Sequence, residues 1–421
     1  MRAVPPAERL TPPVRRILLG SSLSAVGNGM VLPLLIVYLG QVRGLGTQAA
    51  GFVVAYMALV GLVLLWPSGT LVDRVGPRPV LIGGLAVEGI GVLLLTQVTS
   101  VPMAFAVASV LAAGRSFTWS PQAALLGRLT PAAGRQRAFG IQFMLMNLGI
   151  GIGGIIAAIV ADVESTSSFT TLYVLDAATF FVYLGVLLTM PGVGVGPAQH
   201  DDSGPMSGGS YREVFKDRRL LRYSLMALVL LTCGWGSMDV GLPTIMTVIN
   251  GLDVSWVAVA FTVNTATIVL MQMVALRFIH GRSRTRLIAV VALLWAAAWL
   301  ILGMSSIVPM TASIVAACLS TLVFAIGETL IAPIAPSLIN DMSPDHLRGR
   351  YNSVNSVIWS IANALGPALA GVLLGSQLVG LWVGVVTGGS LLAAVLALSL
   401  RRHLSAELDG RTAPASGTMP T

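Results

Sequence analysis

Long apolar runs recur along the whole chain and are separated by short polar stretches. A membrane-spanning helix needs about 20 mainly apolar residues, and most of the runs approach or exceed that length. Barrel strands alternate apolar and polar positions, which these runs do not, so the pattern predicts an all-α membrane protein. Twelve spanning helices are predicted, at residues 17–39, 49–66, 80–98, 103–126, 139–161, 171–190, 221–248, 255–276, 287–304, 312–339, 353–374 and 380–399.

The composition agrees with a chain that faces lipid. Hydrophobic residues make up 55% of the sequence and charged residues only 10%, whereas soluble domains carry about 25% charged residues. The two cysteines, Cys233 and Cys318, lie inside apolar runs, which excludes a disulfide-rich secreted protein. The isoelectric point near 10.2 does not indicate nucleic-acid binding, because the basic residues lie in the gaps between runs.

The basic residues also define an orientation. All but two of the 25 lysines and arginines lie near the N-terminus, in every second gap or near the C-terminus, and the exceptions are Arg43 and Arg115. The positive-inside rule then places both termini in the cytoplasm. The first run is too long for the core of a cleaved signal peptide. We therefore expect a multi-pass protein of the inner (plasma) membrane.

The two halves of the chain repeat each other. Gly114–Gly140 aligns without gaps with Gly327–Ser353, so the fourth and fifth spans correspond to the tenth and eleventh. Halves of equal topology are typical of transporters with parallel repeats. The predicted domains are a six-helix half at residues 1–191, a cytoplasmic linker at 192–216, and a second half with a short cytoplasmic tail at 217–421.

A polar motif joins the second and third predicted spans. Its members are Gly69, Asp73, Arg74, Gly76 and Arg78. The motif resembles the loop signature of the major facilitator superfamily, G-x-x-x-D-R-x-G-R followed by a basic residue, although Pro77 stands at its first closing basic position. The resemblance implies a conformational latch, in which the acid faces the positive amino end of a helix and the arginines meet acids of the other half. A solvated turn is the alternative. The corresponding loop of the second half lacks the acid.

Glycines in the fifth predicted span strengthen this resemblance. Gly140, Gly149 and Gly153 are spaced as in the antiporter motif of proton-driven drug exporters, with Gly154 where that motif has proline. Close helix packing is an alternative reading that is compatible with antiport. The whole chain thus resembles the twelve-helix drug:proton antiporter family, which implies two pseudo-symmetric six-helix bundles.

Five ionisable residues fall inside predicted spans: Glu88, Arg115, Asp176, Asp239 and Glu328. A charge in the bilayer centre costs about 2.5–3.5 kcal/mol or more, so such residues usually face a cavity or a partner. In the family's arrangement, helices 1, 4, 7 and 10 line the cavity, which favours Arg115, Asp239 and Glu328 as proton-coupling residues. Asp176 lies near the predicted outer end of its span, which favours a helix-start or structural hydrogen-bonding role over transport. Glu88 is left open between structural pairing and function.

The substrate cavity is predicted to include Asn28, Trp119 and Trp235. Arg115 resembles the family's buried arginine of the fourth helix, and the repeat places Arg115 and Glu328 at equivalent positions. We therefore expect both at similar depth on opposite cavity walls. Glu328, assisted by Asp239, would alternate between a proton and a cationic substrate while Arg115 tunes its proton affinity. A fixed salt bridge, or two separate hydrogen-bonded anchors, is the alternative.

These patterns predict a secondary active transporter, namely a proton-coupled exporter of amphipathic small molecules that works by alternating access. A dedicated transporter of one metabolite, peptide or lipid is the alternative. No Walker loop, zinc motif or nucleophile elbow is visible, so an enzyme or an ATP-driven pump is not expected. The expected partners are a small-molecule substrate, protons and the lipid bilayer, with no nucleic acid. We expect a monomer with no cofactor and no metal.

Overall fold

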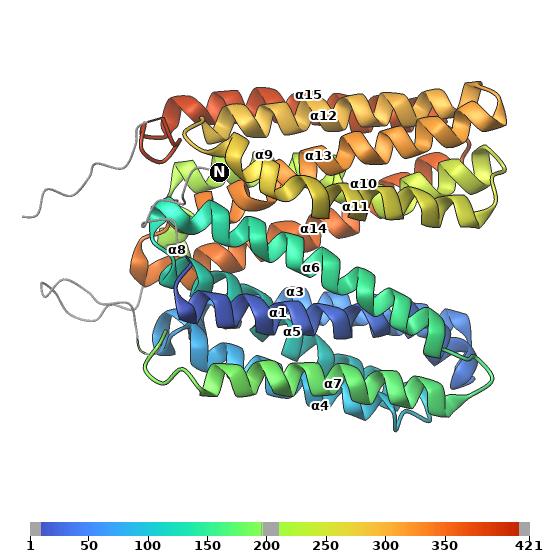
Figure 1. Ribbon diagram of the computed structural model, residues 1–421, viewed down its shortest axis with the longest axis horizontal. Coiled ribbons are helices and arrows are strands. Elements are labelled where there is room, and N and C mark those ends of the chain that lie inside the picture. The colour runs from blue at the N-terminus through green and yellow to red at the C-terminus, as the bar shows by residue number, and fades with distance from the viewer. Residues whose placement is uncertain (1–9, 195, 197–209, 412–421) are drawn as a thin grey trace, which may run out of the picture. The chain divides into compact units, whose positions relative to one another are not determined.

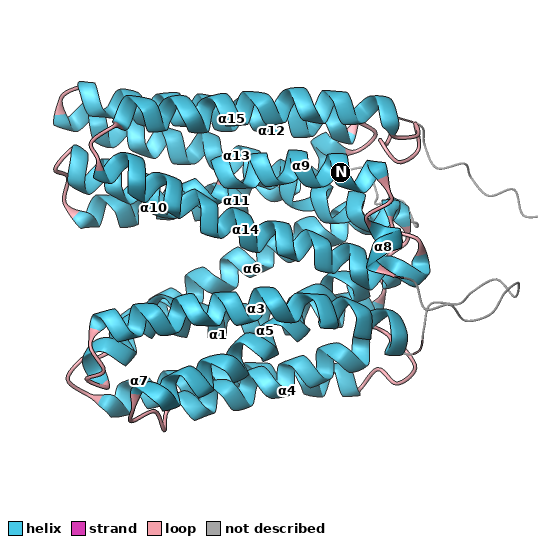
Figure 2. Cartoon of the chain, turned by 180° about the vertical axis from the view of Figure 1, so that it is seen from behind, coloured by secondary structure: helices cyan, strands magenta, loops and turns pink. Residues whose placement is uncertain are grey.

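The computed structural model describes residues 10–194, 196 and 210–411, and in these residues it consists of helices and loops (Figure 2). Eleven of the helices are long and apolar enough to cross a membrane. A twelfth span results if the bent pair Pro12–Val31 and Leu35–Val42 is counted as one. The predicted all-α membrane fold is therefore confirmed.

The long helices of the first half follow one another along the chain and are coloured blue to green in Figure 1. They are α1 (Pro12–Val31), α3 (Thr47–Val75), α4 (Pro77–Leu95), α5 (Val101–Leu129), α6 (Ala132–Val160) and α7 (Thr166–Leu188). The long helices of the second half are α9 (Arg218–Cys233), α10 (Trp235–Thr244), α11 (Val254–Ile279), α12 (Arg284–Met304), α13 (Met310–Met342), α14 (Arg348–Gly375) and α15 (Val379–Leu400). The short α2 (Leu35–Val37) and α8 (Tyr211–Val214) complete the set.

Several helices extend beyond the apolar runs that predicted them. Helix α3 continues through the polar sequence to Val75 and therefore includes Asp73. It ends at Gly76, whose φ of 91° lies in a region that favours glycine. Pro77 then begins α4, as expected for a residue with a fixed φ and no N–H. The motif predicted as a loop is thus mostly helical, with a one-residue turn.

Two spans are interrupted within the apolar sequence. The first is bent by 43°, and Leu32–Leu34 form a 3₁₀ turn that contains a proline between its two parts. The other break is at Gly234, which separates α9 from α10. A proline inside a helix removes a backbone hydrogen bond and clashes with the preceding turn, which accounts for the first break.

The structure divides into two compact units, each with its own core. The first contains the described residues up to Tyr211 together with Ser343–Val357, and the second contains Arg212–Met342 together with the residues from Ile358 onward. Helix α14 thus begins in the first unit and continues in the second. The proposed linker at 192–216 stays a prediction, because residues 195 and 197–209 lie outside the described residues.

Aromatic side chains fill both cores. In the first unit, Tyr38 packs against Phe169 and Tyr173, with ring centroids 5.4 and 4.7 Å apart. In the second, Trp295 stacks on Phe324 with centroids 4.6 Å apart. These large side chains bury much apolar area and hold the helices of each unit in register.

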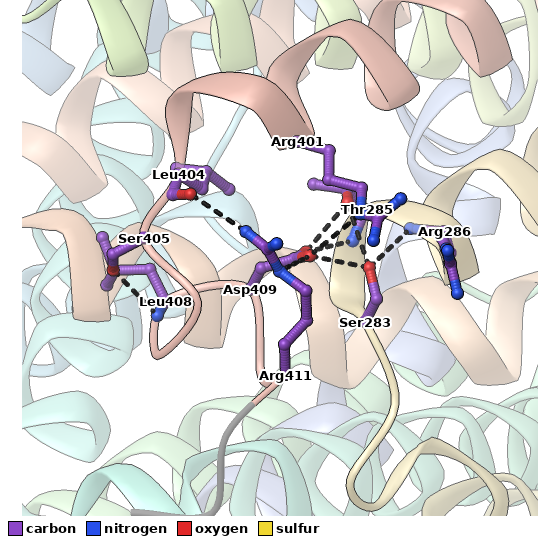
Figure 3. A network of polar contacts seen from close by, with 9 residues as sticks. All are labelled: Ser283, Thr285, Arg286, Arg401, Leu404, Ser405, Leu408, Asp409 and Arg411. Carbon is purple, nitrogen blue, oxygen red and sulfur yellow. Dashed lines mark hydrogen bonds and ion pairs between the residues drawn. The ribbon is translucent and has the colours of Figure 1, made fainter.

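The segment after α15 folds back onto the start of α12 (Figure 3). The carboxylate of Asp409 is fully buried and accepts hydrogen bonds from the Ser283 hydroxyl (2.7 Å) and from the Thr285 backbone N–H (2.9 Å) and hydroxyl (2.8 Å). Arg411 forms an ion pair with the same carboxylate at 3.0 Å. Because an acid at a helix N-terminus satisfies free backbone donors, Asp409 anchors this segment to α12.

The Asp409 anchor predicts a loss of stability on its removal. Asp409→Ala leaves buried donors without an acceptor, at a cost of about 1–3 kcal/mol each. We expect the melting temperature of the purified protein in detergent to fall by several degrees. Glu407→Ala removes an exposed acid of the same segment and should leave the melting temperature unchanged. Equal melting temperatures for the two variants would contradict the anchoring role.

Candidate functional site

Four polar residues from four helices line one small cavity in the first unit. They are Asn28 on α1, Glu88 on α4, Arg115 on α5 and Asp176 on α7. The remaining lining is apolar and includes Met57, Leu111 and Phe180. The structure therefore brings together the predicted Asn28 and Arg115 with two acids that the sequence did not rank as functional.

Small residues on neighbouring helices make room for these two acids. A β-carbon at Gly27 of α1 would clash with Asp176 Oδ1, and one at Gly114 of α5 would lie 2.5 Å from the backbone nitrogen of Glu88. Glu88 and Asp176 are only 3% and 2% exposed. The close approach of the helices thus encloses both carboxyl groups.

The predicted position of Asp176 is wrong. Helix α7 begins at Thr166 rather than at the predicted residue 171, so Asp176 lies near the middle of the helix and not at its start. Its Oδ1 atom has no hydrogen-bond partner among the described residues, and neither has Oε2 of Glu88. A role for Asp176 in starting the helix is therefore excluded, and its carboxyl group faces the cavity.

Glu328 of α13 is the buried acid of the second unit. It is 4% exposed. Its Oε2 accepts a hydrogen bond from Asn264 Nδ2 of α11 at 2.6 Å, and its Oε1 accepts one from the indole N–H of Trp235 on α10. Both donors are neutral, and no ion pair to Glu328 is found in the described part of the chain. The carboxyl is therefore oriented without a compensating positive charge.

The Trp235 ring, which donates to this carboxyl group, packs against two further tryptophans. The ring centroid of Trp235 lies 4.6 Å from that of Trp359 on α14 and 5.2 Å from that of Trp295 on α12. A β-carbon at Gly327 would lie 2.5 Å from Nε1 of Trp295, so the glycine before Glu328 lets α12 and α13 approach closely. The site joins one acid to flat apolar surfaces.

The other predicted cavity residues are placed differently. Asp239 lies one helical turn after Trp235, is exposed, and acts electrostatically on Glu328. Trp119 is 49% exposed and lies one turn after Arg115, but it does not line the cavity of the first unit. Arg115 and Glu328 belong to different units, and their action across a shared cavity stays a prediction.

Asp73 lies at the amino end of α14, inside the first unit. Its Oδ1 accepts a hydrogen bond from the backbone N–H of Gly349 at 2.6 Å, and its Oδ2 accepts one from that of Arg350 at 3.2 Å. The Arg350 guanidinium adds an ion pair at 2.9 Å. The side chains of this pair are only 4% and 5% exposed. The acid thus faces a helix N-terminus, as the sequence predicted, while its latch function stays a prediction.

The other members of the motif have separate roles. Gly69 packs closely on α14, since a β-carbon there would lie 2.6 Å from that of Ser353. Arg74 is exposed. Arg78 is buried, and its Nε and Nη2 donate to the backbone carbonyl of Leu187 on α7 at 3.0 and 2.9 Å. The expected contact of this arginine with an acid of the other half is not what the structure shows.

The glycines of α6 pack against α1. A β-carbon at Gly149 would lie 2.7 Å from the carbonyl oxygen of Ser22, and one at Gly153 would clash with that of Val26. Gly140 is buried, whereas Gly154 is exposed and has nothing near its missing side chain. The geometry supports the packing role of Gly149 and Gly153, and an antiport role stays a prediction.

Sequence reasoning missed three partners of these acids. Asn264 is a polar residue within an apolar run, a signal that could have marked it. Gly349 and Arg350 were visible only as part of the internal repeat. Their pairing with Asp73 depends on tertiary structure, because 276 residues separate Gly349 from the acid. In the described part of the chain, no group of three or more potential ligands is placed to bind a metal ion.

Comparison with known proteins gives consistent matches along the chain. The family model described as Major Facilitator Superfamily matches residues 17–326 and 250–420. The uncharacterized MFS-type transporter YttB of Bacillus subtilis (strain 168) is 22% identical over 365 residues, which cover 85% of this chain and 87% of that protein. Multidrug resistance protein 1 of the same organism is 23% identical over 353 residues, covering 83% and 86%.

The fold is also shared with solved structures. A bacterial homologue of the iron transporter ferroportin, in an outward-facing state, superposes with a TM-score of 0.77. The match covers 93% of this chain and 100% of that chain at 14% identity. At this identity the likeness concerns the fold alone.

The Asp73 contacts predict a local effect of Asp73→Asn. The substitution removes the ion pair with Arg350 and weakens two charge-assisted hydrogen bonds, which are worth about 1.5–3 kcal/mol each. We expect faster amide hydrogen exchange at the start of α14 and impaired transport, at normal levels in the membrane. Asp162→Asn makes the same change at an exposed acid of the first unit and is the matched control. Unchanged exchange and transport in the Asp73 variant would eliminate the latch.

Proposed function

The chain belongs to the major facilitator superfamily, and from this membership we propose that it exports amphipathic, positively charged small molecules in exchange for protons. The family and the fold are those of membrane transporters rather than enzymes. The proposal adds the substrate class, the direction of transport and the coupling ion. It places the exchange at Glu328, in the inner membrane with both termini in the cytoplasm.

The environment of Glu328 carries the proposal. Asn264 and Trp235 orient its two oxygens, but neutral donors do not cancel a negative charge. A buried carboxylate without a positive partner is costly in an apolar surrounding. Binding of either a proton or a cation neutralises it, and the two ligands compete for the same oxygens. This competition is the physical basis for exchange.

The aromatic residues near Glu328 support the substrate class. Trp235 and Trp359 are partly exposed and lie side by side, so they offer apolar faces next to a negative charge. Aromatic faces attract cations and bind flat apolar groups. A lipophilic cation combines both features. The similarity to Multidrug resistance protein 1 supports drugs as substrates.

Coupling follows because Glu328 binds either a proton or the substrate cation, but not both at once. In the proposed cycle, the substrate cation displaces the proton from Glu328 on the cytoplasmic side, and a proton displaces the substrate on the outer side. The exposed carboxylate of Asp239, one turn beyond Trp235, attracts cations toward the site. Asp73 and the start of α14 stabilise one access state, so that Glu328 is open to the cytoplasmic side and to the outer side at different times.

Glu328→Gln tests this cycle, because glutamine imitates the protonated acid. In proteoliposomes with an imposed pH gradient, we expect the variant to lose proton-driven ethidium transport by tenfold or more. Ethidium binding should persist at lower affinity, because the aromatic faces remain. The measurement combines internal pyranine fluorescence, which reports proton movement, with ethidium fluorescence.

Glu407→Gln provides the matched control, since it makes the same chemical change at an exposed acid of the second unit. It should transport as the unchanged protein does. Full proton-driven transport by both Glu328→Gln and Asp239→Asn would refute the coupling scheme. Ethidium movement without any proton movement in the unchanged protein would refute proton exchange itself.

A further inference from the structure

The first unit contains two buried acids that the proposed cycle does not use. Glu88 on α4 and Asp176 on α7 line the cavity with Asn28 and Arg115. We propose that Glu88 and Asp176 together hold one exchangeable proton, which makes this cavity a second proton-binding site. The inference rests on the proposed proton coupling but assigns a site separate from Glu328.

The geometry of the two carboxyl groups points to a small ligand. Both side chains are at least 97% buried, being 3% and 2% exposed. Oε2 of Glu88 and Oδ1 of Asp176 lack hydrogen-bond partners among the residues described. A buried polar oxygen is normally paired with a donor, and the described protein atoms do not supply one to these two oxygens. The cavity has room for about one water molecule.

The charges of the site favour one proton. Glu88 acts electrostatically on Asp176, and Arg115 acts on both acids. With both acids ionised, the set carries one net negative charge in a surrounding that disfavours charge. One proton makes the set neutral, and a second would leave Arg115 uncompensated. Two neighbouring carboxyls then titrate as a pair and not as separate groups.

The other groups around the pair do not replace this proton. Tyr173, one turn before Asp176 on α7, is close enough to interact with it electrostatically and is neutral in its protonated form. Helix α1 contributes Asn28, and α3 contributes Met57, both uncharged. Arg115 is thus the permanent charge of the cavity lining. Tyr38 and Arg43 act on Tyr173 from beyond the cavity.

The proposed step is a simple proton exchange. Hydronium in the cavity water gives up one O–H bond, and one carboxylate of the pair gains an O–H bond. Release reverses the transfer to water. No electrons move, and the permanent charge of Arg115 limits the pair to one proton.

Infrared difference spectra between high and low pH test this site. The full-length protein in lipid is compared in a Glu328→Gln background, where the acid of the second unit cannot contribute. We expect the carbonyl band of a protonated carboxylic acid to appear at low pH. Adding Glu88→Gln or Asp176→Asn should remove this band, because the remaining carboxylate is then balanced by Arg115. Glu164→Gln, at an exposed acid of the same unit, should leave the band unchanged.

The outcomes separate this inference from the proposed function. Absence of the band in the Glu328→Gln background overturns the second site, and so does a band that survives both added substitutions. A band that responds to sodium chloride at constant pH also overturns it, in favour of a metal cation. If one added variant does not fold, the other gives the same answer. A band with the expected losses supports the site even if Glu328→Gln retains full proton-driven transport, in which case only the coupling at Glu328 falls.

Discussion

A carboxyl group enclosed by apolar helices must be neutralised or supplied with donors, and this constraint governs the interior of both units. Removing an ion from water is costly, and partners recover that cost only with good geometry. The first unit places Arg115 next to Glu88 and Asp176. The second unit gives Glu328 two neutral donors and no cation among its described contacts. The first arrangement compensates one of its two carboxyl groups with a permanent positive charge, whereas the second gives its single carboxyl group neutral donors alone among the described contacts.

The internal repeat shows how one backbone device supports both solutions. Gly114 precedes Arg115 and Gly327 precedes Glu328, and each glycine lets a neighbouring helix approach its own closely. The residue that lies against the glycine is Glu88 on α4 in the first unit and Trp295 on α12 in the second. The next position is thus held at a close helix contact in both units. That position carries a positive charge in Arg115 and an acid in Glu328. The residue against the glycine is also different, an acid in the first unit and an indole in the second. The two repeats therefore have different chemistry on the same backbone.

The sequence predicted most of the fold because lipid makes the relevant signals long and local. Apolar length gave the spans, including the broken first one, and the repeat gave the relation between α5–α6 and α13–α14. The position of Asp73 at a helix N-terminus also followed from a motif. The predicted position of Asp176 was wrong, because an error of five residues in the start of α7 moved it from the middle of the helix to its end. Asn264 and Asp409 act through contacts distant in sequence, which no local pattern reveals.

In the second half, the loop motif lacks an acid, but acids from other parts of the sequence lie against it in the structure. Arg282 lies in the loop before α12, Arg284 and Arg286 lie in the first turn of α12, and residues 280–286 contain no acid. Asp341 at the end of α13 pairs with Arg284 at 2.6 Å, and both side chains are less than 10% exposed, at 8% and 9%. Asp409 reaches the same loop from beyond α15 and caps α12. Both acids come from the second unit itself and fix the start of α12 through local contacts.

Asp73 instead binds the start of α14, a helix that continues into the second unit. Of the two loops, the first is therefore the one whose acid binds a helix with residues in both units.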